Sequence, residues 1–292
     1  MSTGRSARPL RGILMIMSAV ALFTVMDAIA KYLSRTYPVP LIVWARYAFH
    51  LLLIVVALGP RLGLGLARTS RPGMQILRGC MLVASTTLFV NAVKRMPLAE
   101  ASSITFVAPV LVTLLAVLIL KERVDLARWL AVGAGFIGVL IVIRPGSGVF
   151  TWASLLPLGT AGFFASYQIL TRHLAGLESP YVSIFYAGLV GTVVMSVGLP
   201  GFWVMPETAL HALLFVVIGI IGGLSHLILM KAYDYASASR LAPFSYTQLL
   251  WVILTGYVVF GDFPDHWSLA GITVIVLSGV YIATHQQFAR RK

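Results

Sequence analysis

Apolar residues fill this chain of 292 residues in long runs, and short polar segments separate one run from the next. Each run holds roughly 18–22 residues, the length of helix that crosses about 30 Å of hydrocarbon. The alternating pattern of a membrane β-barrel strand is absent. The pattern therefore predicts an all-α polytopic membrane protein with ten transmembrane helices. We expect these helices at residues 12–32, 41–59, 74–93, 99–120, 127–143, 151–172, 181–199, 209–230, 240–260 and 267–284.

The polar positions in the first half of the chain recur in the second half. The segment FTVMDAIAKYL at 23–33 matches FASYQILTRHL at 164–174, and LKERVD at 120–125 matches FGDFPD at 260–265. The first match has a shift of 141 residues (23 to 164) and the second a shift of 140 (120 to 260). The polar pairs that coincide are Asp27 with Gln168, Lys31 with Arg172, Glu122 with Asp262 and Asp125 with Asp265. A nearly constant shift in separate blocks predicts two five-helix repeats, residues 1–146 and 147–292.

An odd number of helices in each repeat reverses the direction of the second repeat in the membrane. The first helix of each half then crosses the membrane in the opposite sense, so the halves are inverted repeats. Many secondary transporters follow this plan, with the substrate site between the halves. We expect a central cavity that opens alternately to the two sides. The pattern alone therefore favours transport.

Composition supports a membrane protein, and the distribution of charge predicts its orientation. With 59% hydrophobic and 11% charged residues and a mean hydropathy of +0.92, the chain has too little polar surface for a soluble domain. The net charge of +13 does not indicate nucleic-acid binding, because the basic residues lie in short loops rather than in one patch. Fifteen Lys and Arg fall on the side of the termini and four in the opposite loops. We therefore expect an inner (plasma) membrane protein with both termini in the cytoplasm.

Asp27 is the one acid that lies deep inside a predicted span. Charged groups at membrane depth are costly and usually face a cavity, a partner or water. Arg46 is expected at a similar depth in the second span, where it can form a structural ion pair with Asp27. The alternative is that Asp27 lines the transport pathway and binds a cationic group or a proton. Lys31, four residues after Asp27, either joins this group or snorkels to the membrane surface.

The second half offers a matching group of polar side chains, expected in the inner third of the membrane or near its middle. Its members are Tyr167, Gln168, His226, Tyr246 and Gln248. Hydroxyl, amide and imidazole groups that converge in this way suit an uncharged or zwitterionic solute, although each one is also a common hydrogen-bonding residue between membrane helices. A mid-membrane proline, Pro109, is expected to bend the fourth span and open space beside the group. The candidate substrate-binding residues are Asp27, Asn91, Ser102, Tyr167, Gln168, His226, Tyr246 and Gln248.

Motifs of enzymes, cofactors and metals are absent: the chain has no H-E-x-x-H, no G-x-S-x-G and no P-loop. We expect no enzyme activity, no cofactor and no metal site. The expected partners are a small-molecule substrate and the lipid bilayer.

Small residues predict close helix packing, within one chain or between the chains of a homodimer. These residues are Gly133, Gly135, Gly138, Gly219 and Gly223.

Taken together, these residues resemble a known family. Two inverted five-helix halves, with Glu122 after the fourth span and a glycine-rich fifth span ending in RPG, resemble the EamA-type branch of the drug/metabolite transporter superfamily. The segments MDAIAKYL, TSRPGMQILRG and KAYDYASASRLAPFSY look most like bacterial members that move S-adenosylmethionine, riboflavin or metallophores. The resemblance implies alternating access around a cavity lined by spans 1, 3, 4, 6, 8 and 9. Where many members carry Glu-Pro in span 9, this chain has Gln248-Leu249, so Asp27 would serve in coupling or transport is uncoupled.

The expected function is secondary transport of a small polar metabolite, such as an amino-acid derivative or a metallophore, with export favoured. Within transport, the alternative is uptake of S-adenosylmethionine or riboflavin. From a different class, the alternative is a membrane receptor or scaffold that transports nothing. The short loops leave little surface for signalling, which argues against that class.

Overall fold

The structure is a computed structural model of the chain, and it describes residues 9–121, 126–144, 151–175, 177–236, 241 and 244–289. Over these residues the chain is helical, and its single β-bridge joins Ala175 to Glu178 in a loop. The α-helices are α1 (Pro9–Leu33), α2 (Val39–Leu62), α3 (Pro72–Arg95), α4 (Leu98–Thr105), α5 (Ala108–Leu120), α6 (Leu126–Ile143), α7 (Leu155–Leu174), α8 (Pro180–Gly198), α9 (Ala209–Tyr235), α11 (Thr247–Phe260) and α12 (His266–Ala289). Three short 3-10 helices are η1 (Gly63–Leu66), η2 (Trp152–Ser154) and η3 (Leu199–Gly201).

Six stretches are long and apolar enough to cross a membrane as helices. They are Leu10–Leu33, Val39–Leu66, Pro72–Arg95, Leu98–Ile119, Pro180–Gly201 and Ala209–Tyr235. Shorter apolar helices cover Trp129–Ile143, Thr247–Phe260 and His266–Tyr281. This content is what a polytopic helical membrane protein requires, and helix occurs in each of the ten ranges expected from the sequence.

Three predicted boundaries were wrong by more than three residues. The helix expected from 151 begins at Leu155, after the 3-10 turn η2. The helices expected to end at 230 and 284 continue to Tyr235 and Ala289. Both extensions contain polar residues, because a helix can project beyond the hydrocarbon, whereas the sequence pattern marks only its apolar part. Two residues of the resemblance, Glu122 and Asp125, lie outside the described residues.

The span expected at 99–120 is a broken helix. α4 ends at Thr105 and α5 begins at Ala108, with Phe106 and Val107 between them. Pro109 is the second residue of α5, and it has no N–H to bond the carbonyl of Thr105. The prediction that Pro109 distorts this span is therefore confirmed, with an interruption rather than a bend.

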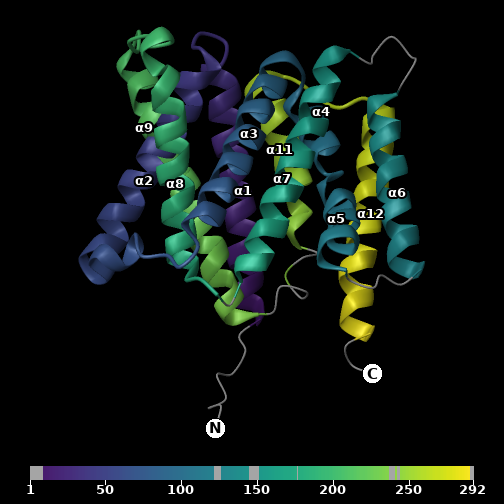
Figure 1. Cartoon of the computed structure of the whole chain (residues 1–292). Helices are drawn as coiled ribbons and strands as arrows, with labels where there is room; N and C mark the ends of the chain where they lie inside the picture. Colours follow the sequence, from purple (N-terminus) through teal and green to yellow (C-terminus); the bar gives the residue numbers. More distant parts are fainter. Residues whose placement is uncertain are drawn as a thin grey trace.

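The helices form a bundle in which α1 begins and α12 ends at the same end (Figure 1). α1 packs against α9 and α11, and α7 packs against α3 and α5. α2 packs against α8 and α9, and α6 pairs with α12. We call the end of the bundle where α1 finishes the Lys31 end.

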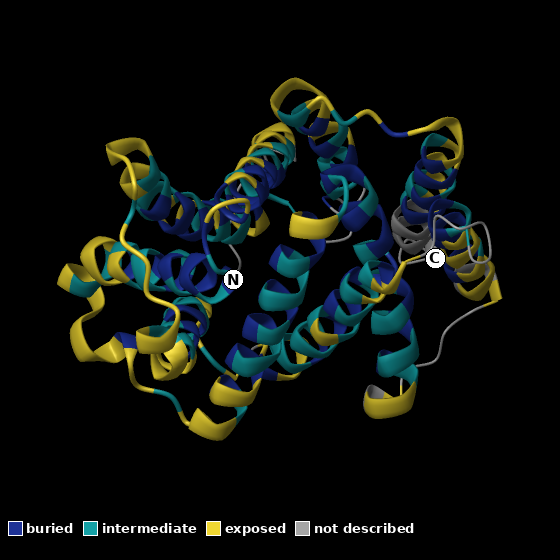
Figure 2. Cartoon of the chain, turned by 90° about the horizontal axis from the view of Figure 1, so that it is seen from above, coloured by how far each residue is buried: buried dark blue, intermediate teal, exposed yellow. Residues whose placement is uncertain are grey.

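Exposed residues follow the outer faces of the helices and the loops, whereas buried residues face inward (Figure 2). Many exposed side chains on the helices are large and apolar; examples are Leu52, Val56, Val197, Leu213 and Val258. A soluble protein does not present such a surface to water, because each exposed side chain of this kind costs free energy. The outer surface suits contact with lipid.

Two glycines of α9 allow α2 to approach closely. A Cβ placed on Gly219 would lie 2.4 Å from Cβ of Phe49 and 2.9 Å from the carbonyl oxygen of Arg46. A Cβ on Gly223 would lie 2.9 Å from the side chain of Leu53. Packing by these glycines is confirmed, and it brings the face of α2 that carries Arg46 against α9. A Cβ placed on Gly133, in contrast, would have no neighbour within 4 Å.

Candidate functional site

Asp27 and Arg46 face one another inside the bundle. Oδ1 of Asp27 on α1 lies 4.0 Å from Nη1 of Arg46 on α2, and the two side chains are 10% and 14% exposed. No hydrogen bond joins these groups in the described part of the chain. The pair is therefore buried and oppositely charged but loose, an arrangement in which either partner can take another ligand.

A second buried cation, Arg78 of α3, connects three helices. Its Nη1 donates to the hydroxyls of Tyr167 (3.4 Å) and Thr171 (3.2 Å) of α7, and its Nη2 donates to the carbonyl oxygen of Ser183 of α8. The guanidinium also lies 5.1 Å from the centre of the Tyr167 ring. Only 2% of Arg78 is exposed. Arg78 falls within the span expected at residues 74–93, but no role was predicted for it from the sequence.

Two histidines pack against each other next to Arg46. His50 of α2 is one turn after Arg46, and its ring centre is 5.7 Å from that of His226 on α9. His226 also packs edge-on against Phe23 of α1, with ring centres 4.9 Å apart. Phe23 and Tyr167 both pack against the hydrophobic core that contains Tyr47, and the guanidinium of Arg46 lies 6.0 Å from the centre of the Tyr47 ring. Through these aromatic rings the Asp27–Arg46 pair, the two histidines and Arg78 form a single group inside the bundle, which we call the central cluster.

No role was predicted from the sequence for several polar residues in or beside this cluster. Its neighbour Tyr47 bonds the hydroxyl of Thr86 at 2.7 Å, and Gln75 donates to the hydroxyl of Ser183 at 3.3 Å. A signal was present for two of them: His50 is four residues from Arg46, and Gln75 is three residues from Arg78, so each pair shares a helix face. Polar residues spaced in this way in an apolar helix mark the face turned toward the protein interior.

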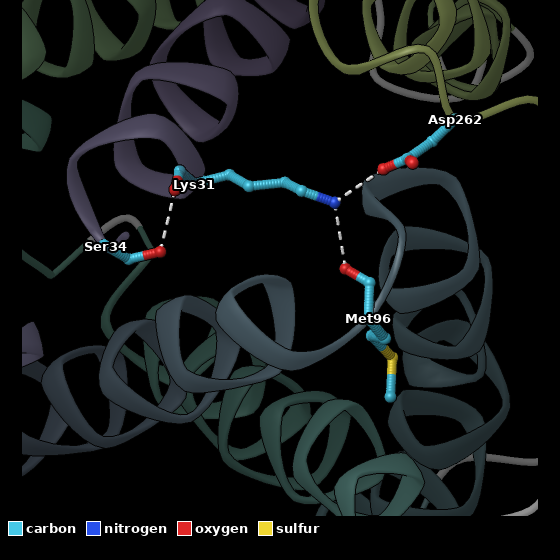
Figure 3. A network of polar contacts seen from close by, with 4 residues as sticks. All are labelled: Lys31, Ser34, Met96 and Asp262. Atoms are coloured by element: carbon cyan, nitrogen blue, oxygen red, sulfur yellow. Dashed lines mark hydrogen bonds and ion pairs between the residues drawn. The ribbon is translucent and has the colours of Figure 1, made fainter. Parts of the chain in front are cut away.

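Lys31 forms a separate network at the Lys31 end of the bundle (Figure 3). Its Nζ lies 2.9 Å from Oδ2 of Asp262, in the loop after α11, and 3.1 Å from the carbonyl oxygen of Met96. The ammonium is also 4.9 Å from the centre of the Phe260 ring. Lys31 itself is only 7% exposed, and its ammonium reaches a loop carboxylate at this end of the bundle rather than the Asp27–Arg46 pair.

A second ion pair lies beside this network. Nη1 of Arg144, just after α6, is 2.7 Å from Oδ2 of Asp265, just before α12. Oδ1 of Asp265 also accepts from the backbone N–H of Ser268 at 2.8 Å and so caps α12. The bonds from Ser268 and the guanidinium of Arg144 lower the pKa of Asp265 from its ordinary value of 3.8.

The remaining predicted residues fall at three places. Asn91 of α3 bonds within its own helix, donating to the carbonyl of Thr87 at 2.9 Å and accepting from Arg95 at 2.9 Å. Ser102 of α4 is 4% exposed, and its hydroxyl has no hydrogen-bond partner among the described residues. Tyr246 packs against Phe106 at the break between α4 and α5, with ring centres 5.5 Å apart.

Of the predicted candidates, Asp27, Tyr167 and His226 therefore belong to the central cluster. Gln168 and Gln248 are half-buried on α7 and α11. Tyr246 and Ser102 lie with the broken helix α4–α5. The described residues include no group of three or more His, Cys, Asp or Glu side chains that could hold a metal ion.

Comparison with known proteins identifies the family. The sequence model of the EamA-like transporter family matches residues 10–144 and again residues 151–284. The chain belongs to this family. A riboflavin transporter of Vibrio cholerae is 32% identical over 94% of this chain and 93% of its own length. An S-adenosylmethionine uptake transporter of Rickettsia bellii is 28% identical over 91% of both chains. A pseudopaline exporter of Pseudomonas aeruginosa is 28% identical over 93% of this chain and 95% of its own length.

A solved structure shares the fold over 96% of this chain and 98% of that chain, with a TM-score of 0.68 and 18% sequence identity. The resemblance drawn from the sequence is thus confirmed. The apolar helices, the family and the relatives together show a multi-pass membrane protein of the transporter class rather than an enzyme, and they support a small molecule as its substrate.

Proposed function

We propose that this protein is a secondary transporter of the inner membrane that moves a small polar metabolite by alternating access. The observation that carries the proposal is the central cluster, which places Asp27, Arg46, Arg78 and two histidines inside a bundle whose outer surface is apolar. Ionisable groups at membrane depth are retained where a polar solute or an ion passes.

Helix packing supports the two inverted repeats of this proposal. If residues 1–146 and 147–292 are equivalent, α1 corresponds to α7, α2 to α8, α3 to α9, α4–α5 to the segment that ends with α11, and α6 to α12. The packing of α1 on α9 then has its counterpart in α7 on α3, and that of α1 on α11 has its counterpart in α7 on α5. The pairs α2–α8 and α6–α12 map onto themselves, and both are in contact. A two-fold axis in the membrane plane gives this exchange of partners.

The two ion pairs at the Lys31 end support a conformational cycle. Lys31 and Arg144 belong to the first half of the chain, whereas Asp262 and Asp265 belong to the second half. These pairs hold the halves together at one end of the bundle, so access from that end requires that they part. With the cytoplasmic termini expected from the Lys and Arg distribution, the Lys31 end faces the outside.

Such a cycle is reversible, and the solute gradient or a coupled ion sets the direction of net flux. Export of an amino-acid derivative or metallophore and uptake of S-adenosylmethionine or riboflavin are therefore two uses of one mechanism. The relatives accord with this view, since one is named an uptake transporter and another an exporter.

Counterflow in proteoliposomes tests the proposal. Vesicles loaded with unlabelled S-adenosylmethionine or riboflavin are diluted into the same labelled solute, and a transporter accumulates label transiently by exchange. We expect accumulation above that of protein-free vesicles for at least one of these solutes or for an amino-acid derivative from a wider set. A receptor or scaffold gives none, and a folded protein that exchanges no member of the set would contradict the proposal.

A further inference from the structure

We propose that the transported solute carries a carboxylate group and that Arg78 is the residue that binds it. This inference rests on the proposed function and adds the substrate class and the binding residue. It follows from the burial of Arg78, from the chemistry of its partners, and from its position relative to the Asp27–Arg46 pair and the Lys31 network.

Arg78 is a buried cation whose partners are neutral. Its hydrogen bonds go to two hydroxyls and one backbone carbonyl, those of Tyr167, Thr171 and Ser183. No carboxylate oxygen of the described residues lies within 4.0 Å of it, whereas Lys31, Arg46 and Arg144 each have one. Buried charges in proteins are usually compensated by an opposite charge, because desolvation of an ion is expensive. An anionic ligand supplies the charge that this site lacks.

Hydrogen-bonding capacity at the site is also incomplete. The Nε of Arg78 is buried without a hydrogen-bond partner, and so is Oε1 of Gln75, one turn earlier on α3. Arg78 is 2% exposed and Gln75 is 0% exposed, so bulk water does not complete these bonds. A free Nε beside an Nη group is the edge of guanidinium that binds a carboxylate with two parallel hydrogen bonds.

Charge around Arg78 favours a single negative charge on the ligand. The central cluster contains the guanidinium groups of Arg46 and Arg78 and one carboxylate, that of Asp27. With the histidines counted as neutral, the excess is one positive charge. The carboxylate of Asp27 faces Arg46, whereas no carboxylate of the described residues faces Arg78, so the excess resides at Arg78. A carboxylate neutralises this excess, whereas an uncharged solute leaves it in place.

The position of Arg78 fits access from the end opposite Lys31. Arg78 is the seventh residue of α3, which at 1.5 Å per residue places it about 9 Å from the start of that helix. Its partners Thr171 and Ser183 are close to the end of α7 and the start of α8. Asp27 lies at a similar distance from the other end of α1. A solute that enters opposite the Lys31 network therefore meets Arg78 first and the Asp27–Arg46 pair next.

Matched ligands and matched variants test this inference on the full-length protein in detergent. The probes are S-adenosylmethionine, its decarboxylated analogue and riboflavin, which has no charged group near neutral pH; free amino acids and their methyl esters extend the set. Binding is read from the melting temperature and from isothermal titration. In the unmodified protein we expect a carboxylate compound to bind at least tenfold more tightly than its partner without the carboxylate.

The variant Arg78→Gln removes the charge and keeps a hydrogen-bonding side chain. We expect it to lose at least tenfold in affinity for the carboxylate compound and to bind the partner without a carboxylate as before. Arg78→Lys, which keeps the charge but not the paired N–H groups, is expected to be intermediate. Arg68→Gln in the exposed loop after η1 is the control for loss of one positive charge and should bind like the unmodified protein.

Three results with the unmodified protein would overturn the inference. These are equal binding of both members of each pair, binding of riboflavin alone, and no binding of any carboxylate compound. They do not depend on whether a variant folds. Equal losses for both ligands in Arg78→Gln would show a purely structural role and would overturn it too. If a carboxylate compound binds through Arg78 but no counterflow occurs, the proposed transport fails while the anion site stands. If a neutral solute exchanges and no carboxylate compound does, transport stands and the anion site fails.

Discussion

Lys31 and Asp262 lie 2.9 Å apart although 231 residues separate them in the chain. One ends the first helix of the first half and the other follows α11 in the second half, so this contact ties the halves together at the Lys31 end. Lys31 is buried and its ammonium also bonds the carbonyl of Met96, whereas the side chain of Asp262 is 36% exposed. A transporter that alternates must break this ion pair each time that end opens.

Lys31→Met should therefore shift the protein toward a state that is open at the Lys31 end. Ser34 provides a reporter, because it is fully buried beside the network and its hydroxyl bonds the carbonyl of Lys31. In a Cys80→Ala background, we expect a cysteine at position 34 to react slowly with a membrane-impermeant maleimide, and at least severalfold faster once Lys31→Met is added.

The control for this experiment is Lys94→Met, which removes an exposed positive charge at the end of α3 and should leave the labelling rate unchanged. Exchanging the charges, with Lys31→Asp and Asp262→Lys together, should restore protection if the ion pair itself closes this end. Equal labelling in Lys31→Met and in its parent would show that the pair does not control access.

The Asp265–Arg144 pair predicts how stability depends on pH. Asp265 has a lowered pKa in the folded protein, so its contribution is present above the ordinary value of 3.8 and is lost as pH falls through the folded value. Asp265→Ala removes both the helix cap and the ion pair and should cost about 1 kcal/mol near pH 7. Asp265→Asn keeps a good cap and should cost less, since the pair is partly exposed to solvent.

Melting temperatures in detergent at pH 7 and pH 3 check this prediction. The unmodified protein should lose more stability between these pH values than Asp265→Asn, because the variant has no carboxylate to protonate. An identical pH dependence in the two proteins would show that Asp265 does not contribute to the loss of stability at low pH.

The close contact of Gly219 with α2 allows a test of how separating α9 from α2 affects the protein. A Cβ added to Gly219 would lie 2.4 Å from Cβ of Phe49, which is closer than two such carbon atoms approach in real proteins. Gly219→Ala should therefore force the helices apart, destabilise the fold by about 1–3 kcal/mol, and lower counterflow by displacing Arg46 and His50. Gly133→Ala is the matched control, because an added Cβ there has no neighbour within 4 Å. Equal melting temperatures in the two variants would show that the contact with α2 is not tight.

The sequence predicted the helices well because hydrocarbon thickness sets their length and composition. It also predicted that Asp27 and Arg46 would face each other, since their distances from the ends of successive helices give them similar depth. The same reasoning works for any polar residue whose position along a membrane helix can be read from the chain.

Contacts that depend on the rotation of each helix about its axis could not be predicted from the sequence. Lys31 was expected in the central group or at the surface, yet it bonds Asp262, which stands in a loop whose path no periodicity describes. Arg78 was placed in a span without a role, because nothing in an apolar pattern shows that its guanidinium would meet only hydroxyls and a carbonyl. Asn91 stays a predicted substrate-binding residue, and the hydrogen bond of its amide to Thr87 in the same helix was not foreseen.

The last prediction concerns Asp27. Its carboxylate lies 4.0 Å from Arg46 without a hydrogen bond between them, so the pair is looser than the buried ion pairs whose disruption costs roughly 3–5 kcal/mol. Asp27→Asn keeps the volume of the side chain and removes its charge. We expect this variant to fold with nearly the melting temperature of the unmodified protein and to lose counterflow, or to lose its dependence on pH.

A second substitution separates the two roles that remain open for Asp27. If the carboxylate only neutralises Arg46, Asp27→Asn leaves a buried cation without its partner, and the double variant with Arg46→Gln should regain both stability and transport. If the carboxylate serves the solute or a coupled proton, the double variant stays inactive because the group that acts is gone. The loose geometry favours the second result. Normal transport with normal pH dependence in a folded Asp27→Asn protein would contradict it, since the only deep acid of the described bundle would then have no part in the cycle.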